Sequence, residues 1–91
     1  MKALFTLGQV VATPGVLKAI EASGDALSSY LSRHITGDWG EVGAHDRKEN
    51  ELSLEQGFRL MSVYSLSTGV KIWVITEADR SSTCILLPEE Y

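Results

Sequence analysis

The sequence predicts one α+β domain, in which an N-terminal helical hairpin and a third surface helix pack on a C-terminal three-stranded antiparallel β-meander. Three observations predict it. Apolar residues in 14–36 recur at helical spacing, and those in 58–76 alternate with polar ones. The chain has 91 residues, of which 44% are hydrophobic, enough for one modest core. We therefore expect residues 1–91 to form a single domain.

The first helix has clear start and stop signals. Residues 3–11, which precede it, are mostly apolar and predict a short strand that runs into a loop. Thr13 can cap the helix, and Pro14 suits its first position, where the missing N–H costs nothing. Gly24 can end it in a left-handed conformation.

The second helix is predicted to begin at an Asp25 cap and to end at Gly37. Its apolar side contains Leu27, Tyr30, Leu31 and Ile35. Together the two helices would form a hairpin.

Residues 37–43 contain three glycines around Trp39 and predict a loop. Asp46 and Glu49 have the spacing of a capping box for a third helix that ends before Gly57, and an Arg47–Glu51 pair would support it. Its few apolar residues place this helix on the surface.

From Phe58 onward, residues of the two sheet faces alternate along the chain, and this pattern predicts a hairpin whose turn is residues 67–69. A third strand over residues 83–87 would end at Pro88. If the helices cover one sheet face, the other face gathers several apolar side chains. That face should be covered by the N-terminal segment or by a second copy, in a homodimer through the β-sheet. Its apolar residues are Met61, Val63, Trp73 and Ile75.

The formal net charge is −4, and residues 37–57 carry all of it. The eight cationic residues are scattered, which argues against direct binding to nucleic acid. The acidic segment is interpreted as a solvated helix face or as a docking surface for a basic partner. Its carboxylates are Asp38, Glu41, Asp46, Glu49, Glu51 and Glu55.

Trp39 has two interpretations. An aromatic side chain on a glycine-rich, acidic loop suits the pocket of a protein partner. The alternative is a tryptophan that folds back and plugs the open side of the sheet, because the core is small. The first interpretation makes Asp38, Trp39, Glu41, Glu49, Glu51 and Glu55 the partner-binding residues.

The cellular compartment is predicted from the apolar runs and the cysteine content of the sequence. Its longest aliphatic and aromatic runs are four residues, against the roughly 20 that a membrane-spanning helix needs, and polar residues interrupt the N-terminal apolar stretch. Cys84 is the one cysteine and is expected to be a structural thiol. We therefore expect a cytoplasmic protein with no membrane contact.

Residues that could carry chemistry are few. His34 and His45 are eleven positions apart and Cys84 is isolated, so we expect neither a metal nor a cofactor, with His34 contacting the last carbonyls of its helix. No phosphate-binding loop or nucleophile elbow occurs, and no catalytic residue is assigned.

The remaining ligand-site candidates are Glu77, Asp79 and Arg80. In a continuing strand the two carboxylates would lie on one side about 7 Å apart, with Arg80 as an anion contact. The alternative is turn chemistry, with Asp79 accepting backbone N–H groups.

Four runs carry a resemblance to a known group: residues 7–15 (LGQVVATPG), 37–40 (GDWG), 71–80 (KIWVITEADR) and 86–91 (LLPEEY). They resemble short, uncharacterised bacterial proteins of plasmids, integron cassettes and other mobile elements. Some of those are labelled type I restriction modification subunits. A methyltransferase needs a larger domain and a motif with adjacent prolines, whereas Pro14 and Pro88 are isolated. The resemblance therefore implies a genetic setting and no catalytic residue.

Two functions follow. The favoured one is an interaction or accessory protein of a mobile element, which binds a protein through the Trp39 loop and acidic segment 37–57. The alternative is a ligand-binding protein or enzyme that uses Glu77, Asp79 and Arg80. A DNA mimic is a third possibility, although −4 over 21 residues is sparse beside a duplex with one charge per roughly 1.7 Å.

Overall fold

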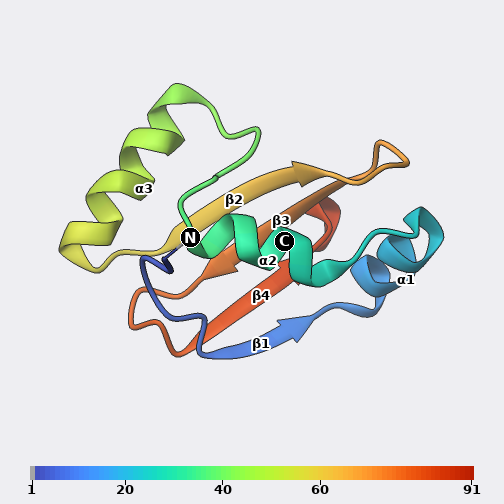
Figure 1. The fold of residues 1–91 in the computed structure, drawn as a ribbon, viewed down its shortest axis with the longest axis horizontal. Helices are drawn as coiled ribbons and strands as arrows, with labels where there is room; N and C mark the ends of the chain where they lie inside the picture. Colours follow the sequence, from blue (N-terminus) through green and yellow to red (C-terminus); the bar gives the residue numbers. More distant parts are fainter. Residues whose placement is uncertain (1) are drawn as a thin grey trace.

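The computed structural model describes residues 2–91 and contains a four-stranded mixed β-sheet with three α-helices (Figure 1). The α+β class is therefore confirmed. In chain order the elements are β1 (Gln9–Ala12), α1 (Pro14–Ser23), α2 (Leu27–Ile35), α3 (Ala44–Gln56), β2 (Leu60–Ser65), β3 (Lys71–Thr76), β4 (Ser82–Leu86) and the short 3₁₀ helix η1 (Pro88–Glu90).

The sheet has the strand order β1-β4-β3-β2. Strands β2, β3 and β4 form the expected antiparallel meander, with Val63 opposite Trp73 and Ile75 opposite Cys84. The expectation of three strands is wrong, because β1 joins parallel to β4 with Val11 opposite Cys84. These two partners are distant in the sequence, and no local pattern encodes that pairing.

Helix α1 begins and ends where the sequence indicates. The Thr13 hydroxyl accepts from the Val16 N–H at 3.2 Å, Pro14 occupies the first turn, and Gly24 closes the helix at φ +75°. Helix α2 differs, since Ala26 takes the N-cap position without a side-chain bond.

Asp25 does not cap α2, because its carboxylate has other partners. It accepts from the Tyr30 hydroxyl at 2.6 Å and from the Ser67 backbone N–H at 2.8 Å. These bonds join the start of α2 to the turn between β2 and β3.

Both helices cover the same sheet face, but they do not pack along each other as a hairpin. Figure 1 shows α2 across the middle of the sheet and α1 beyond the end of β1. Val16 and Ile20 of α1 and Tyr30 of α2 pack against sheet residues that include Val74 and Ile85. This cluster is the main core.

Helix α3 lies beside β2, at the opposite edge of the sheet from β1 (Figure 1). Its expected end is confirmed, since Gly57 takes φ +76° as the C-cap. The capping box is wrong: the helix begins three residues earlier, and Gly43 is an N-cap without a side-chain bond. The Arg47–Glu51 pair is also wrong, because Glu51 bonds the indole of Trp39.

The second sheet face is approached by the C-terminus instead of the N-terminal segment. Phe5 of that segment lies on the helical side against His34 and Trp39. On the other side, the Tyr91 ring packs edge-on against Trp73 at 5.4 Å between centroids. A homodimer through the sheet stays a prediction.

Within residues 2–91, no helix combines the length and the apolar character needed to cross a bilayer.

Candidate functional site

Trp39 is buried, with 1% of its surface exposed. Its ring stacks on Phe5 at 6.2 Å and meets His34 edge-on at 5.7 Å between centroids. The indole Nε1 donates to Glu51 Oε2 at 2.9 Å, so its one polar group is satisfied inside the fold. The interpretation of Trp39 as an exposed anchor is therefore wrong. The residue folds back as the alternative predicts, but it packs on the helical side against Phe5 and His34 and not on the open side of the sheet.

The glycine-rich loop covers the free edge of β2. Val63 donates its N–H to the Trp39 carbonyl at 3.0 Å, and its carbonyl accepts from the Glu41 N–H at 2.7 Å. Between them Gly40 has φ +74°, and an added Cβ would lie 2.0 Å from the Val63 carbonyl oxygen. Glycine is needed here because the backbone makes a close approach to the strand in a left-handed conformation.

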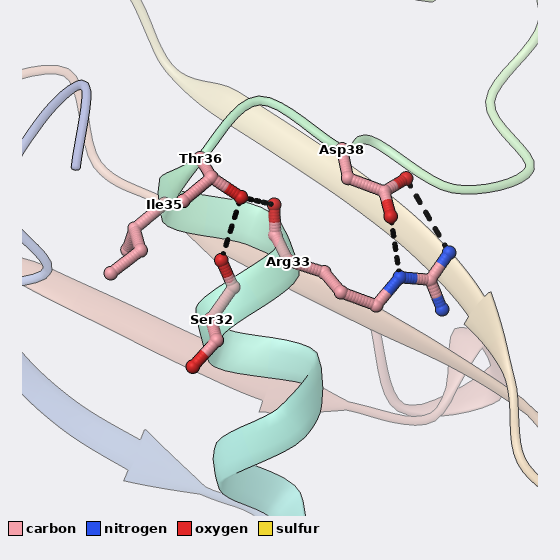
Figure 2. A pocket seen from close by; sticks show the side chains of 5 residues that line it. All are labelled: Ser32, Arg33, Ile35, Thr36 and Asp38. Atoms are coloured by element: carbon pink, nitrogen blue, oxygen red, sulfur yellow. Dashed lines mark hydrogen bonds and ion pairs between the residues drawn. The ribbon is translucent and has the colours of Figure 1, made fainter. Parts of the chain in front are cut away.

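Asp38 lies in an open depression of about 430 Å³ formed by the end of α2 and the loop, shown in Figure 2. The Arg33 guanidinium bonds both Asp38 carboxylate oxygens, with Nε at 2.6 Å, and this bond lowers the pKa of Asp38. Arg33 also lies 4.4 Å above the Tyr64 ring centroid. The Thr36 hydroxyl bonds carbonyls of its own helix. The charged groups of the depression are therefore paired with each other.

The five carboxylates assigned to partner binding divide into two groups. Three have partners within the fold: Asp38 pairs with Arg33, Glu41 with Lys71, and Glu51 with the Trp39 indole. Glu49 and Glu55 are exposed, and within residues 2–91 neither forms an ion pair with lysine or arginine, although His45 lies 3.7 Å from Glu49. These two carboxylates remain available to a partner.

Helix α3 is attached to the sheet by polar contacts on its inner side. The Asn50 amide donates to the Met61 carbonyl at 2.7 Å and accepts the Met61 N–H at 3.1 Å, as a neighbouring strand would. Leu54 adds apolar contact with the cluster around Trp39. The helix is thus fixed in position although it buries little apolar surface.

The outer side of α3 exposes Leu52, 45% of whose surface is accessible. Glu49 and Glu55 lie three residues before and after it, so the two carboxylates flank the leucine on the helix surface. Sequence reasoning missed this arrangement. The signal was present, because residues two apart on a helix point about 200° apart, so Leu52 and Leu54 cannot both face the core.

The Glu77, Asp79 and Arg80 group lies in the turn between β3 and β4, because β3 ends at Thr76. Glu77 and Asp79 are exposed, and Asp79 accepts the Ser81 N–H at 2.9 Å, as the turn alternative predicts. The expected strand alignment of the two carboxylates is therefore wrong.

Arg80 is held by backbone carbonyls. Its guanidinium donates to Phe58 at 2.7 Å, Ser53 at 3.0 Å, Ala78 at 3.0 Å and Glu77 at 3.1 Å. These bonds join the end of α3 to the turn. Both terminal nitrogens of the guanidinium, Nη1 and Nη2, are therefore engaged by backbone carbonyls.

His34 has an exposed fraction of 0% and belongs to a buried chain of hydrogen-bonded polar groups, here called the His34 chain. Thr83 donates to the Leu7 carbonyl at 2.8 Å, and the Thr76 hydroxyl lies 2.7 Å from that of Thr83. His34 Nε2 lies 2.9 Å from Thr76 Oγ1, and its Nδ1 lies 2.6 Å from Ser62 Oγ. A carbonyl only accepts, so the chain runs from Ser62 through a neutral His34 protonated on Nε2.

This pairing has the atoms of a serine–histidine dyad, but Ser62 and His34 are fully buried and no substrate can reach them. Burial lowers the pKa of His34 to about 4, with a smaller contribution from the charge of Arg80. The expected contact of His34 with helix-end carbonyls is wrong. No sequence pattern predicts this chain, because its members come from five separate segments.

Among residues 2–91, no three histidine, cysteine or acidic side chains are grouped so that they could hold a metal ion. The Cys84 thiol is half-buried, and desolvation raises its pKa.

No protein-family model, curated protein or solved structure matches this chain in comparisons of its sequence and fold.

Proposed function

We propose that this protein is an interaction or accessory protein that binds a basic protein partner through the outer face of α3. This face is defined by Glu49, Leu52 and Glu55. The observation that carries the proposal is an exposed leucine between two carboxylates that have no lysine or arginine partner among residues 2–91.

An apolar centre with a charged rim is the usual composition of a protein-binding surface. Leu52 supplies a side chain that a partner can desolvate, and Glu49 and Glu55 favour lysine or arginine around it. The carboxylates also speed the encounter with a basic partner, because long-range attraction acts before contact.

The Trp39 loop contributes indirectly to this surface. Trp39 holds Glu51 through its indole, and the backbone of the loop pairs with β2 beside the helix. A rigid helix loses little conformational entropy when a partner binds, so this positioning favours affinity. The loop and the acidic segment thus act together, with the contact residues on α3.

The cellular setting belongs to the same proposal. The resemblance to mobile-element proteins supports an accessory role in such an element, and the free, half-buried Cys84 is compatible with a reducing cytoplasm.

The test is an affinity capture from bacterial lysate with two charge-reversed chains compared with the natural one. Glu49→Lys with Glu55→Lys should lose the specifically captured protein, because both attractive charges are inverted. The matched control reverses two exposed carboxylates outside α3, Glu21→Lys with Glu89→Lys, and should keep it. Glu51 is left unchanged because it holds Trp39.

Leu52→Ala provides a second arm that leaves the charge unaltered. The captured protein should dissociate at least several-fold faster, as expected for loss of an apolar contact at the centre of an interface. Circular dichroism should show every variant folded. Equal capture by all variants, or no specific capture by the natural chain, would reject the proposal.

A further inference from the structure

The two edges of the sheet are protected to different extents. At the β2 edge, the outward backbone groups of Met61 bond the Asn50 amide, and those of Val63 bond the loop at Trp39 and Glu41. Side-chain and loop covers of this kind prevent an edge strand from pairing with another chain. The β1 edge has no equivalent cover among the described residues.

Strand β1 bonds β4 on one side only. Gln9 donates to the Ser81 carbonyl at 2.9 Å and Thr13 to that of Ile85 at 3.1 Å, so the odd-numbered residues turn their backbone groups toward β4. The backbone groups of Val10 and Ala12 then point away from the sheet, since neighbouring strand residues alternate. Figure 1 shows β1 along the open lower edge.

The side chains of β1 also leave this edge accessible. Val10 and Val11 are 41% and 44% exposed, and residues 9–12 contain no charge and no proline. Native edge strands are usually blunted by such residues. An uncharged edge with unpaired N–H and C=O groups is a template for another strand.

We propose that a second copy of this chain pairs with β1 in antiparallel orientation, about a two-fold axis at Val11. Val10 of one copy then lies opposite Ala12 of the other, and Ala12 of the first copy lies opposite Val10 of the second. Each of these pairs exchanges two backbone hydrogen bonds, so the interface gains four. The two Val11 side chains meet at the axis, and the sheets join into one of eight strands.

The distribution of charge favours pairing of two copies through β1 over pairing through other surfaces. The net charge of −4 opposes self-association, but all of it comes from residues 37–57, which include α3 and the loop at the β2 edge. Three strand spacings, about 14 Å, separate β2 from β1. Pairing through β1 therefore places the two acidic helices at the far ends of the joined sheet, well beyond a Debye length of about 8 Å.

The proposal is independent of the α3 surface, and its test uses different residues. Sedimentation velocity of the full chain should show a dimer at micromolar concentration. Val11→Lys should raise the dissociation constant about tenfold or more, because like charges would face each other across the axis. Val70→Lys is the control, since Val70 is similarly exposed in the turn between β2 and β3 and should leave the dimer unchanged.

A cross-linking arm tests the axis directly. Val11→Cys in a Cys84→Ser background should form an intermolecular disulfide under mild oxidation, because directly opposite residues have the Cβ separation that a disulfide needs. The Cys84 change prevents bonding within the copy, since Val11 and Cys84 are register partners. Val70→Cys in the same background should form no more than a trace.

A monomer at all concentrations would overturn the proposal, as would a dimer indifferent to Val11→Lys or equal cross-linking at both positions. In any of these cases the α3 proposal would stand or fall on its own variants.

Discussion

Gly40 shows how one residue can determine the position of a loop. Its backbone passes so close to β2 that a Cβ would lie 2.0 Å from the Val63 carbonyl oxygen and 2.6 Å from the Tyr64 ring. This close approach lets Trp39 and Glu41 pair their backbone with Val63, and the pairing holds the Trp39 indole in the core. The glycine therefore has a steric role beyond turn flexibility.

We predict that Gly40→Ala destabilises the fold by about 3 kcal/mol, through left-handed strain plus displacement of the β2 edge. Chemical denaturation monitored by tryptophan fluorescence would measure this change. Gly57→Ala is the control, because Gly57 also has positive φ but no atom within 4 Å of an added Cβ. It should cost only the strain, about 1 kcal/mol. Equal costs at both positions would contradict the close approach.

Single-residue patterns were a good guide where the role of the residue is local. Thr13 and Gly24 do what their types suggest, because capping involves backbone within four residues. Asp25 does not, since a tertiary contact to Ser67 competes for its carboxylate. The sequence could indicate the type of bond Asp25 forms but not its partner.

At the scale of elements, α3 is a polar helix held to a strand by an amide. Asn50 replaces a missing neighbouring strand by bonding both backbone groups of Met61. This arrangement explains how a helix with so few apolar residues keeps a fixed place. It also closes the edge of β2 to intermolecular pairing.

We predict that Asn50→Ala lowers stability by about 1–3 kcal/mol, the usual cost of leaving partly buried backbone groups unpaired. It should also increase aggregation on storage, because the β2 edge is uncovered. Denaturant titration and light scattering would measure the two effects. Gln56→Ala on the same helix is exposed and should change neither. Stability unchanged by Asn50→Ala would show that the amide does not hold the helix.

The β2–β3 hairpin was predictable because its pairing is local, with residues of alternating character on either side of a short turn. The pairing of β1 with β4 was not. Its partners lie more than 70 residues apart, and a strand of four residues has no pattern that specifies a distant parallel neighbour.

At the scale of the whole molecule, the His34 chain ties five parts of the fold together. It joins α2 to β2, β3 and β4, and through Thr83 to the N-terminal segment at Leu7. Every member of the His34 chain has a hydrogen-bond partner. The same is true of every buried side-chain nitrogen and oxygen atom among the described residues. Such a network favours one arrangement of these segments over alternatives.

The network predicts a pH dependence of global stability. The folded pKa of His34, about 4, lies below its ordinary value of 6.5, so the unfolded chain binds more protons between these values. The contribution of neutral His34 to the free energy of unfolding is therefore fully present above about pH 6.5, and it is lost as the pH decreases toward 4. Between pH 7 and pH 4.5 the free energy of unfolding should fall by about 2.5 kcal/mol.

Denaturant titrations at successive pH values would measure this slope, and NMR titration of the imidazole gives a direct readout. The His34 ring should stay neutral down to about pH 5. His45→Gln removes the second imidazole, so the remaining resonance is that of His34. A His34 ring that titrates near 6.5 in the folded protein would contradict the assignment of the chain.

The candidate site was predictable only in part. The sequence placed the acidic surface in segment 37–57, because charge is a property of composition and needs no fold. Which carboxylates are free was decided by contacts: Asp38, Glu41 and Glu51 are paired within the fold, while Glu49 and Glu55 flank Leu52 outside it.

The sequence by itself determined the α+β class, the β2–β3–β4 meander, the ends of α1 and the acidic character of one segment. Each depends on residues within a few positions of one another or on composition alone. The tertiary structure decided the place of β1, the burial of Trp39 and the His34 chain. Those features include contacts between segments up to more than 70 residues apart, and such contacts form only when the free energy of the whole packed chain selects them over their local alternatives.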